Sequence, residues 1–168
     1  NCTWEGDNTV LVQQAAKFIL ANFEKKMRGK PLTDYGTLKF LKNVGEDVVK
    51  PNLTESKHLH NTTTLISIFE HRCLLLVQKC AGRLAERVEK KENQFDAWNN
   101  SVTCHVQHLV KAYGELFCLN EFQKKNVTVV DKNTRLMLEK FAVLVALNSI
   151  ETDIGLFRED DYLSGDAY

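Results

Sequence analysis

The amino-acid sequence predicts an all-α fold, a helical bundle in which neighbouring helices run mostly antiparallel. Apolar residues recur at three- and four-residue steps along several long stretches, as they do in helices that bury one side. The 168 residues include only 2 prolines and 8 glycines, which favours long helices over many short strands. Such helices can bury their apolar sides only against one another, so a bundle is the expected architecture.

The first helix is expected from about Asn8 to Met27, with a broad apolar side. Either Asp7 or Asn8 can cap its start, because a short side-chain oxygen accepts a hydrogen bond from a free N–H of the first turn. Residues 28–31 read R-G-K-P and should end the helix, since glycine suits the C-terminal cap and proline lies beyond it. A short helix is expected next at Tyr35–Leu41. Residues 42–56 are loop-like, with sparse periodicity.

Three longer helices are expected in the remaining chain, at about His58–Lys91, Gln94–Lys124 and Lys132–Arg158. In each of them the positions expected to be buried follow the helical repeat. In the order of the chain, these positions are Leu65, Ile66, Phe69, Cys73, Leu76, Val77, Cys80, Leu84 and Val88, then Phe95, Trp98, Val102, His105, Val106, Leu109, Tyr113, Leu116, Phe117 and Phe122, then Leu136, Leu138, Phe141, Leu144, Val145, Leu147, Ile150 and Ile154.

Charge and cysteine content narrow the class of protein. The 22 basic and 22 acidic residues give a formal net charge of zero, which argues against an electrostatic nucleic-acid binder. No uncharged apolar run is long enough to predict a membrane span. The 5 cysteines are odd in number and contain no C-x-x-C pair, so buried thiols in a reducing compartment fit better than a disulfide framework.

Two pairs of histidines raise the question of a metal site. His58 and His60 are separated by one residue, and His105 and His108 lie three residues apart on an expected helix. No third ligand follows either pair at a recognisable spacing, so we interpret them as packing or surface histidines and expect no metal.

The segment Thr3–Val10 reads T-W-E-G-D-N-T-V and leads directly into the first helix. From the residues alone it is a capping turn, with Glu5 outside a helix start and Gly6 allowing another group to approach the backbone closely. Together with Gln13–Leu20 (Q-Q-A-A-K-F-I-L), it resembles the acyl-CoA oxidase family of the peroxisomal type. In that family a T-[FYW]-E-G-[ED]-N-T-V segment carries the catalytic glutamate and leads into a helix of the C-terminal α-helical region.

Shorter segments extend the resemblance over nearly the whole chain, although the first segment is the most specific. Each of these segments is similar to a segment of the family. The segments are Phe69–Arg72 (F-E-H-R), Ala97–Asn99 (A-W-N), Leu109–Ala112 (L-V-K-A), Glu115–Phe117 with Phe122, and 144–163. The resemblance implies a single helical region over residues 1–168, truncated at both ends. Residues 1–30 form the glutamate motif and first helix, 31–56 a loop-rich linker, and 57–168 three long helices.

The resemblance implies an oxidoreductase that converts a fatty acyl-CoA to a trans-2-enoyl-CoA. Glu5 would be the base that removes the α-proton, while a bound FAD accepts the β-hydrogen as hydride and O2 reoxidises the flavin to give H2O2. Trp4 and Gly6 would contact the substrate, and Asp7, Asn8 and Thr9 the flavin. Packing explains Trp4, and capping explains Asp7 and Asn8, equally well.

The resemblance also implies a homodimer, a peroxisomal location and β-oxidation of fatty acids. The chain would supply the base and a helical body, whereas a preceding region would hold most of the flavin and substrate. This chain alone is therefore expected to be an incomplete, inactive piece of the enzyme.

Two other functions remain open from the sequence. Five N-x-[ST] sequons would suit a secreted four-helix cytokine-like binding protein, and they begin at Asn1, Asn52, Asn61, Asn99 and Asn126. Against it, the cysteine number is odd and several sequons fall within expected helices. A helical scaffold that descends from the oxidase and has lost activity is the other alternative.

Overall fold

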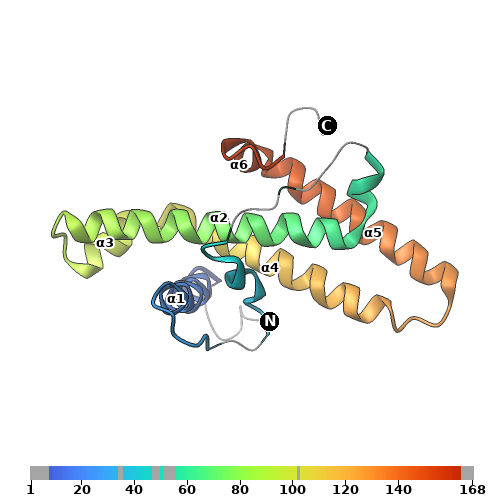
Figure 1. Ribbon diagram of the computed structural model, residues 1–168, viewed down its shortest axis with the longest axis horizontal. Helices are drawn as coiled ribbons and strands as arrows, with labels where there is room; N and C mark the ends of the chain where they lie inside the picture. Colours follow the sequence, from blue (N-terminus) through green and yellow to red (C-terminus); the bar gives the residue numbers. More distant parts are fainter. Residues whose placement is uncertain (1–7, 34–35, 47–49, 51–55, 102, 164–168) are drawn as a thin grey trace. The chain divides into compact units, whose positions relative to one another are not determined.

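The fold is all-α, as the sequence predicts. The computed structural model describes residues 8–33, 36–46, 50, 56–101 and 103–163, and in these ranges it contains helices and no strand. The α-helices are α1 (Asn8–Met27), α2 (Thr62–Glu89), α3 (Gln94–Ser101), α4 (Thr103–Asn126), α5 (Lys132–Thr152) and α6 (Ile154–Glu159) (Figure 1). Two 3₁₀-helices, η2 (Lys39–Asn43) and η3 (Ser56–His60), lie between α1 and α2. Over these ranges, none of the helices has the length and hydrophobicity that crossing a membrane would require.

The chain forms two compact units, to which α2 and α4 both contribute. Unit 1 comprises Asn1–Glu46 and Cys73–Gly114, and unit 2 comprises Asp47–Arg72 and Glu115–Tyr168.

Unit 1 is built around α1. Ala16 of α1 and Val106 of α4 are buried together, and partly buried side chains of α1, α2, α3 and α4 pack against them, namely Val12, Leu20, Leu84, Trp98 and Val110. One apolar side of α1 therefore lies in a core, whereas Val10 and Leu11, which the sequence also places on the apolar side, are 53% and 40% exposed.

Local signals end α1 where the sequence places its end. Gly29 adopts a left-handed conformation with φ of 66°, and the N–H of Lys30 donates to the carbonyl of Lys25 at 2.8 Å. This closure satisfies a carbonyl that the last turn would leave free, and glycine adopts the required φ without steric cost. The buried Asn22 then ties the following loop to the helix, because its Oδ1 accepts a hydrogen bond from the N–H of Thr33 at 2.8 Å.

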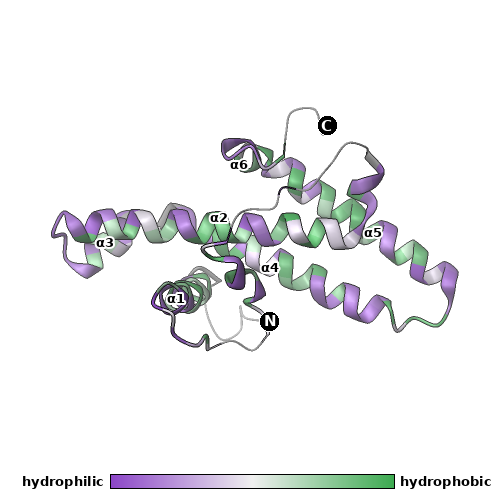
Figure 2. Ribbon diagram, viewed as in Figure 1, coloured by the Kyte–Doolittle hydropathy of each residue, from purple (hydrophilic) through white to green (hydrophobic). Residues whose placement is uncertain are grey.

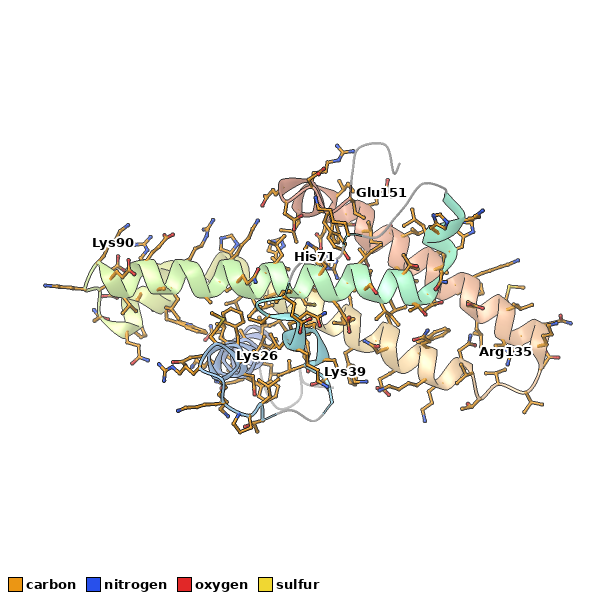
Figure 3. The ribbon with its side chains drawn as sticks, viewed as in Figure 1. Lys26, Lys39, His71, Lys90, Arg135 and Glu151 are labelled. Carbon is orange, nitrogen blue, oxygen red and sulfur yellow. The ribbon has the colours of Figure 1, made fainter. Side chains whose placement is uncertain are left out.

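Unit 2 contains the first part of α2, the second part of α4, and α5 and α6. Its buried apolar side chains come from all four helices and from the segment after α6, and include Leu65, Ile68, Phe69, Leu116, Ala146, Ile150, Phe157 and Leu163. Asp131 caps α5, since its carboxylate accepts a hydrogen bond from the N–H of Thr134 at 2.6 Å. Arg135 and Glu151 mark the two ends of α5 (Figure 3).

One of the expected long helices is divided. The helix expected over Lys132–Arg158 is present as α5 and α6, whereas α3 and α4 are described on either side of residue 102 within the helix expected over Gln94–Lys124. The division falls at Asp153, whose ψ of 19° lies outside the helical range. Its carboxylate is held by the side chain of Arg72, which the local sequence of α5 does not reveal.

Several side chains expected in the core are exposed. The largest departures are Phe95 at 74% exposure, Val88 at 58%, Phe117 at 44%, and Leu136, Phe141, Leu144 and Val145 of α5 at 45–66%. On α5, apolar residues occur on two opposite sides, and only one of them is packed within unit 2.

Of the described cysteines, Cys73 and Cys80 are buried thiols as expected, whereas Cys118 is exposed. Burial raises the pKa of Cys80 to about 11, and the nearby Arg83 charge only partly opposes this. Cys80 is therefore a packing residue and not a nucleophile, because the reactive form of cysteine is the thiolate.

Candidate functional site

The segment expected to carry the chemistry lies largely outside the described residues. This holds for Trp4, Glu5, Gly6 and Asp7, and the side chains of Asn8 and Thr9 are likewise not described. The backbone of Asn8 begins α1, where the sequence predicts the helix start. The assignments of Glu5 as the base and of its neighbours as substrate and flavin contacts stay predictions.

The start of α1 suits an anionic ligand group. The first four N–H groups of an α-helix have no partner within the helix, and the helix dipole adds a partial positive charge there. The first turn of α1 contains no acidic residue that would repel an anion. The diphosphate of FAD is an anion of this kind, so the start of α1 is compatible with flavin contacts at Asn8 and Thr9, which stay a prediction.

Contacts within unit 1 fix α1 beyond its first turn. The ammonium of Lys17 lies 5.5 Å from the centre of the Trp98 ring, a cation–π distance. Near the other end, Lys26 Nζ donates to the carbonyl of Lys42 at 2.9 Å. These contacts therefore anchor α1 within unit 1.

The histidine pairs do not build a metal site in the described part of the chain, where no group of three potential ligand side chains converges. The pKa of His105 is lowered, first by burial and then by electrostatic interaction with the side chains of Arg83, His108 and Lys79. Such surroundings disfavour a bound cation as they disfavour a protonated imidazole.

Unit 2 contains a buried charge cluster that arises from the F-E-H-R segment. Arg72 is completely buried on α2, and its guanidinium binds two carboxylates, that of Glu115 on α4 and that of Asp153 at the α5–α6 junction (2.8 Å). The same guanidinium lies 4.5 Å from the centre of the Phe69 ring. A buried arginine needs such partners, because an unpaired charge in the interior is strongly unfavourable.

The next residue toward the start of α2, His71, is labelled in Figure 3 and makes a second link within unit 2. Its Nε2 lies 2.5 Å from Oδ2 of Asp160, and since a carboxylate only accepts, the imidazole N–H is the donor. The imidazole also stacks on Tyr162, with ring centres 3.6 Å apart and planes 5° apart. The neighbouring Asp161 pairs with Lys50 at 3.1 Å.

These contacts hold the short helix α6 at both ends. Asp153 precedes α6 and binds Arg72, and Asp160 follows α6 and binds His71. A helix of 6 residues has too few hydrogen bonds to be stable by itself, so tertiary contacts must hold it in place. Two adjacent residues of α2 thus position the C-terminal part of unit 2.

Burial lowers the pKa of His71, and the hydrogen bond from its ring to Asp160 only partly offsets this effect. In the unfolded chain the histidine titrates near 6.5. The unfolded state then binds more protons than the folded state as the pH falls below about 6.5. We expect the unfolding free energy to decrease with falling pH in this window, and a His71→Gln variant to show a smaller decrease.

Chemical denaturation at a series of pH values measures this effect. His60→Gln is the matched control, because His60 is exposed on η3 in the same unit. His105 contributes the same sign of dependence, so His71→Gln should reduce the slope without abolishing it. An unchanged slope in His71→Gln would show that His71 is not the group responsible.

Sequence reasoning identified F-E-H-R as a family-like segment but gave its residues no role. It also did not identify Asp153 and Asp160 as partners of this segment. In the sequence these two aspartates are recognisable only as acidic residues that flank a short apolar helix. Their role as partners of His71 and Arg72 becomes clear only when the position of α2 next to them is known.

A sequence profile described as "Acyl-CoA oxidase" matches residues 61–168, which is more than half of the chain. The chain belongs to the acyl-CoA oxidase family. The matched residues include the whole of α2 and the His71 and Arg72 contacts to the α6 segment.

Individual members of the acyl-CoA oxidase family align with nearly the whole chain. "Acyl-coenzyme A oxidase 2, peroxisomal" of Arabidopsis thaliana is 30% identical over 168 residues, covering 96% of this chain and 24% of the relative. "Peroxisomal acyl-coenzyme A oxidase 1" of Homo sapiens is 22% identical, covering 98% of this chain and 25% of the relative. The chain therefore spans about a quarter of the length of these relatives.

Solved structures of acyl-CoA oxidases share the fold of this chain. Arabidopsis thaliana acyl-CoA oxidase 1 superposes with a TM-score of 0.86 at 22% identity, covering 99% of this chain and 25% of that one. Acyl-CoA oxidase-1 of Caenorhabditis elegans, complexed with FAD and ATP, gives a TM-score of 0.82 at 20% identity, covering 99% of this chain and 24% of that one. At these identities the likeness establishes the fold alone.

Proposed function

We propose that this chain is part of a flavin-dependent acyl-CoA oxidase that converts fatty acyl-CoA to trans-2-enoyl-CoA and reduces O2 to H2O2. The observation that carries the proposal is the family match over residues 61–168. The T-W-E-G-D-N-T-V segment supports it, because it supplies a glutamate where the reaction needs a base.

The residues of this chain would have separate tasks in that reaction. Glu5 removes the α-proton of the thioester, since a carboxylate aimed at that carbon can act as a general base. Gly6 lets the thioester region approach the backbone, and Trp4 contributes an apolar wall that excludes water. Asp7, Asn8 and Thr9 bind the FAD through the start of α1.

FAD, when bound, supplies the acceptor for the β-hydride and passes the electrons to O2. The Caenorhabditis elegans relative described as complexed with FAD supports this choice of cofactor. Since the chain spans about a quarter of its relatives, other parts of the oxidase would provide most contacts to the flavin and the acyl-CoA.

The names of the relatives support a proposal for the location, whereas the assembly is proposed from the family resemblance alone. Several of them are named as peroxisomal, and we propose that this oxidase acts in the peroxisome in the β-oxidation of fatty acids. We also propose that it acts as a homodimer, as the family resemblance implies.

The family match favours an oxidase-derived protein over a secreted cytokine-like bundle. The sequons give the bundle little support, since Asn61 caps α2, with its Oδ1 accepting from the N–H of Thr63 at 2.8 Å. Asn99 lies within α3. The inactive scaffold differs from the enzyme only in its activity, so an assay must separate them.

The test is an assay of the full-length protein that contains this chain. We expect its visible absorption spectrum to show bound flavin, and addition of a fatty acyl-CoA in air to give enoyl-CoA and peroxide in equal amounts. A flavin-containing protein that forms neither product would be the inactive scaffold. A colourless, glycosylated protein would contradict the oxidase function altogether.

A further inference from the structure

Basic side chains are concentrated in unit 1 where α1 ends and where η2 follows it. The residues between 24 and 46 include six basic and three acidic side chains, although the whole chain has 22 of each. Figure 2 shows the hydrophilic colour at the end of α1 that leads into this segment. We refer to the six basic residues as the basic patch, and they are Lys25, Lys26, Arg28, Lys30, Lys39 and Lys42.

A direct contact joins the two parts of the basic patch. Lys26 lies in the last turn of α1, and its Nζ donates to the carbonyl of Lys42 in η2 at 2.9 Å. Figure 3 labels Lys26 on α1 and Lys39 on η2. The end of the helix and η2 therefore belong to one surface of unit 1.

Most of the positive charge in the patch is not cancelled by a nearby carboxylate. Arg28 does have such a partner, since it pairs with Glu24 at 2.6 Å. Lys25 instead donates to the hydroxyl of Thr33 at 2.6 Å, and Lys26 donates to a backbone carbonyl. Because these acceptors are neutral, both ammonium groups keep their full charge.

Stabilisation of α1 does not account for the whole patch. Cations in the last turn of a helix are favoured by the helix dipole, which explains the lysines within α1. Lys30, Lys39 and Lys42 lie beyond α1 and are exposed, and within the described ranges no carboxylate pairs with them. These three lysines increase the local charge without stabilising the helix end.

An exposed apolar side chain lies among these cations. Met27 is 64% exposed at the last residue of α1, between Lys26 and Arg28, and the exposed Pro31 follows the helix. A single exposed apolar residue is ordinary by itself. In the middle of a basic surface, however, it matches the boundary of a bilayer, where anionic headgroups meet apolar acyl chains.

We propose that the basic patch and Met27 form a surface that binds the anionic face of a lipid bilayer. A folded protein partner fits less well, because a stable interface buries about 800 Å² on each partner around an apolar centre, and the patch offers one exposed methionine. A bilayer requires no matching shape, and its anionic headgroups complement the six cations. Binding of this kind needs no membrane-spanning helix.

The proposal rests on charge and exposure and does not depend on the proposed reaction. Under that reaction, however, such a surface would have a use. A fatty acyl-CoA carries an apolar chain that partitions into bilayers, so an oxidase bound at the bilayer surface would be close to its substrate.

Vesicle flotation of the full-length protein tests the proposal. The probes are vesicles of phosphatidylcholine alone and vesicles that also contain phosphatidylserine, both at low ionic strength. We expect binding to the anionic vesicles to be at least about tenfold tighter, because each basic residue near an anionic bilayer strengthens binding about fivefold. Added salt should release the protein, since it screens exposed charges. Equal binding to both kinds of vesicle would overturn the proposal.

Reversal of charge locates the binding surface. A triple variant with Lys30→Glu, Lys39→Glu and Lys42→Glu should bind the phosphatidylserine vesicles at least about tenfold more weakly than the wild type. The matched control makes the same change in net charge at three exposed lysines of unit 2, and it combines Lys125→Glu, Lys132→Glu and Lys140→Glu. This control should bind like the wild type. An equal loss in both triple variants would show that total charge and not the patch determines binding, and would overturn the proposal.

A fluorescent amino acid tests the apolar part of the surface. In the full-length protein, the emission of Met27→dansylalanine should shift to the blue when phosphatidylserine vesicles are added, because the probe enters an apolar environment. Lys132→dansylalanine, at an exposed position of unit 2, should show no shift. Unchanged emission from position 27 in vesicle-bound protein would overturn the proposal. Neither measurement uses enzyme activity, so failure of the proposed reaction and failure of this surface are distinguishable.

Discussion

Glutamine in place of Glu5 is expected to lower the rate of acyl-CoA dehydrogenation by about 10²–10⁴-fold in the full-length oxidase. The amide has nearly the size and shape of the carboxylate but cannot accept a proton from the α-carbon. Loss of a base lowers the rate of the chemical step, whereas binding of the acyl-CoA and of FAD should change little. Anaerobic mixing of the oxidase with one equivalent of acyl-CoA measures this step directly, as the loss of oxidised-flavin absorbance.

Glu24→Gln is the matched control, because it makes the same chemical change on α1. The Glu24 side chain is 59% exposed and pairs with Arg28 at 2.6 Å, one turn along the helix. An exposed pair of this kind contributes little to stability, so this variant should reduce flavin at the wild-type rate. A Glu5→Gln oxidase as fast as Glu24→Gln would remove Glu5 from the role of base, even if the protein proves to be an acyl-CoA oxidase.

The helices could be predicted from the sequence where local signals define them. Gly29 and Pro31 mark the end of α1, and Asp131 caps the start of α5, and both signals act within a few residues of the helix. The family and its candidate base could also be predicted, because the segment around Glu5 is contiguous. The geometry around Glu5 stays a prediction, since that residue lies outside the described part of the chain.

The contacts that hold α6 could not be predicted, because they join residues far apart in the sequence. The partners of Arg72 lie 43 and 81 positions away, and that of His71 lies 89 positions away. Helical periodicity indicates which side of a helix is apolar but does not identify the residues that will face it. On α5 even the buried side was ambiguous, since apolar residues occur all around the helix.

Replacing Arg72 by methionine is expected to lower the unfolding free energy by about 3 kcal/mol, which is large against the stability of a typical domain. Methionine fills a similar volume, but it leaves the carboxylates of Glu115 and Asp153 without their shared partner. These carboxylates are 26% and 18% exposed, so water relieves part of the cost, and we expect the lower end of the range for a broken buried pair. Denaturant unfolding followed by circular dichroism measures the change.

A matched pair of variants separates the buried charge from the loss of an arginine. Arg87 also lies on α2, and Arg87→Met removes its ion pair with Glu92, which follows the helix; since Arg87 is 38% exposed, we expect a much smaller loss of stability. A triple variant combines Arg72→Met with Glu115→Gln and Asp153→Asn, which also neutralise the two partners. This triple variant should recover much of the lost stability, since no unpaired charge then remains. If Arg72→Met cost no more than Arg87→Met, the charge cluster would not be what holds the start of α6. If the triple variant regains stability, the loss in Arg72→Met comes from the unpaired carboxylates and not from the absence of the arginine side chain itself.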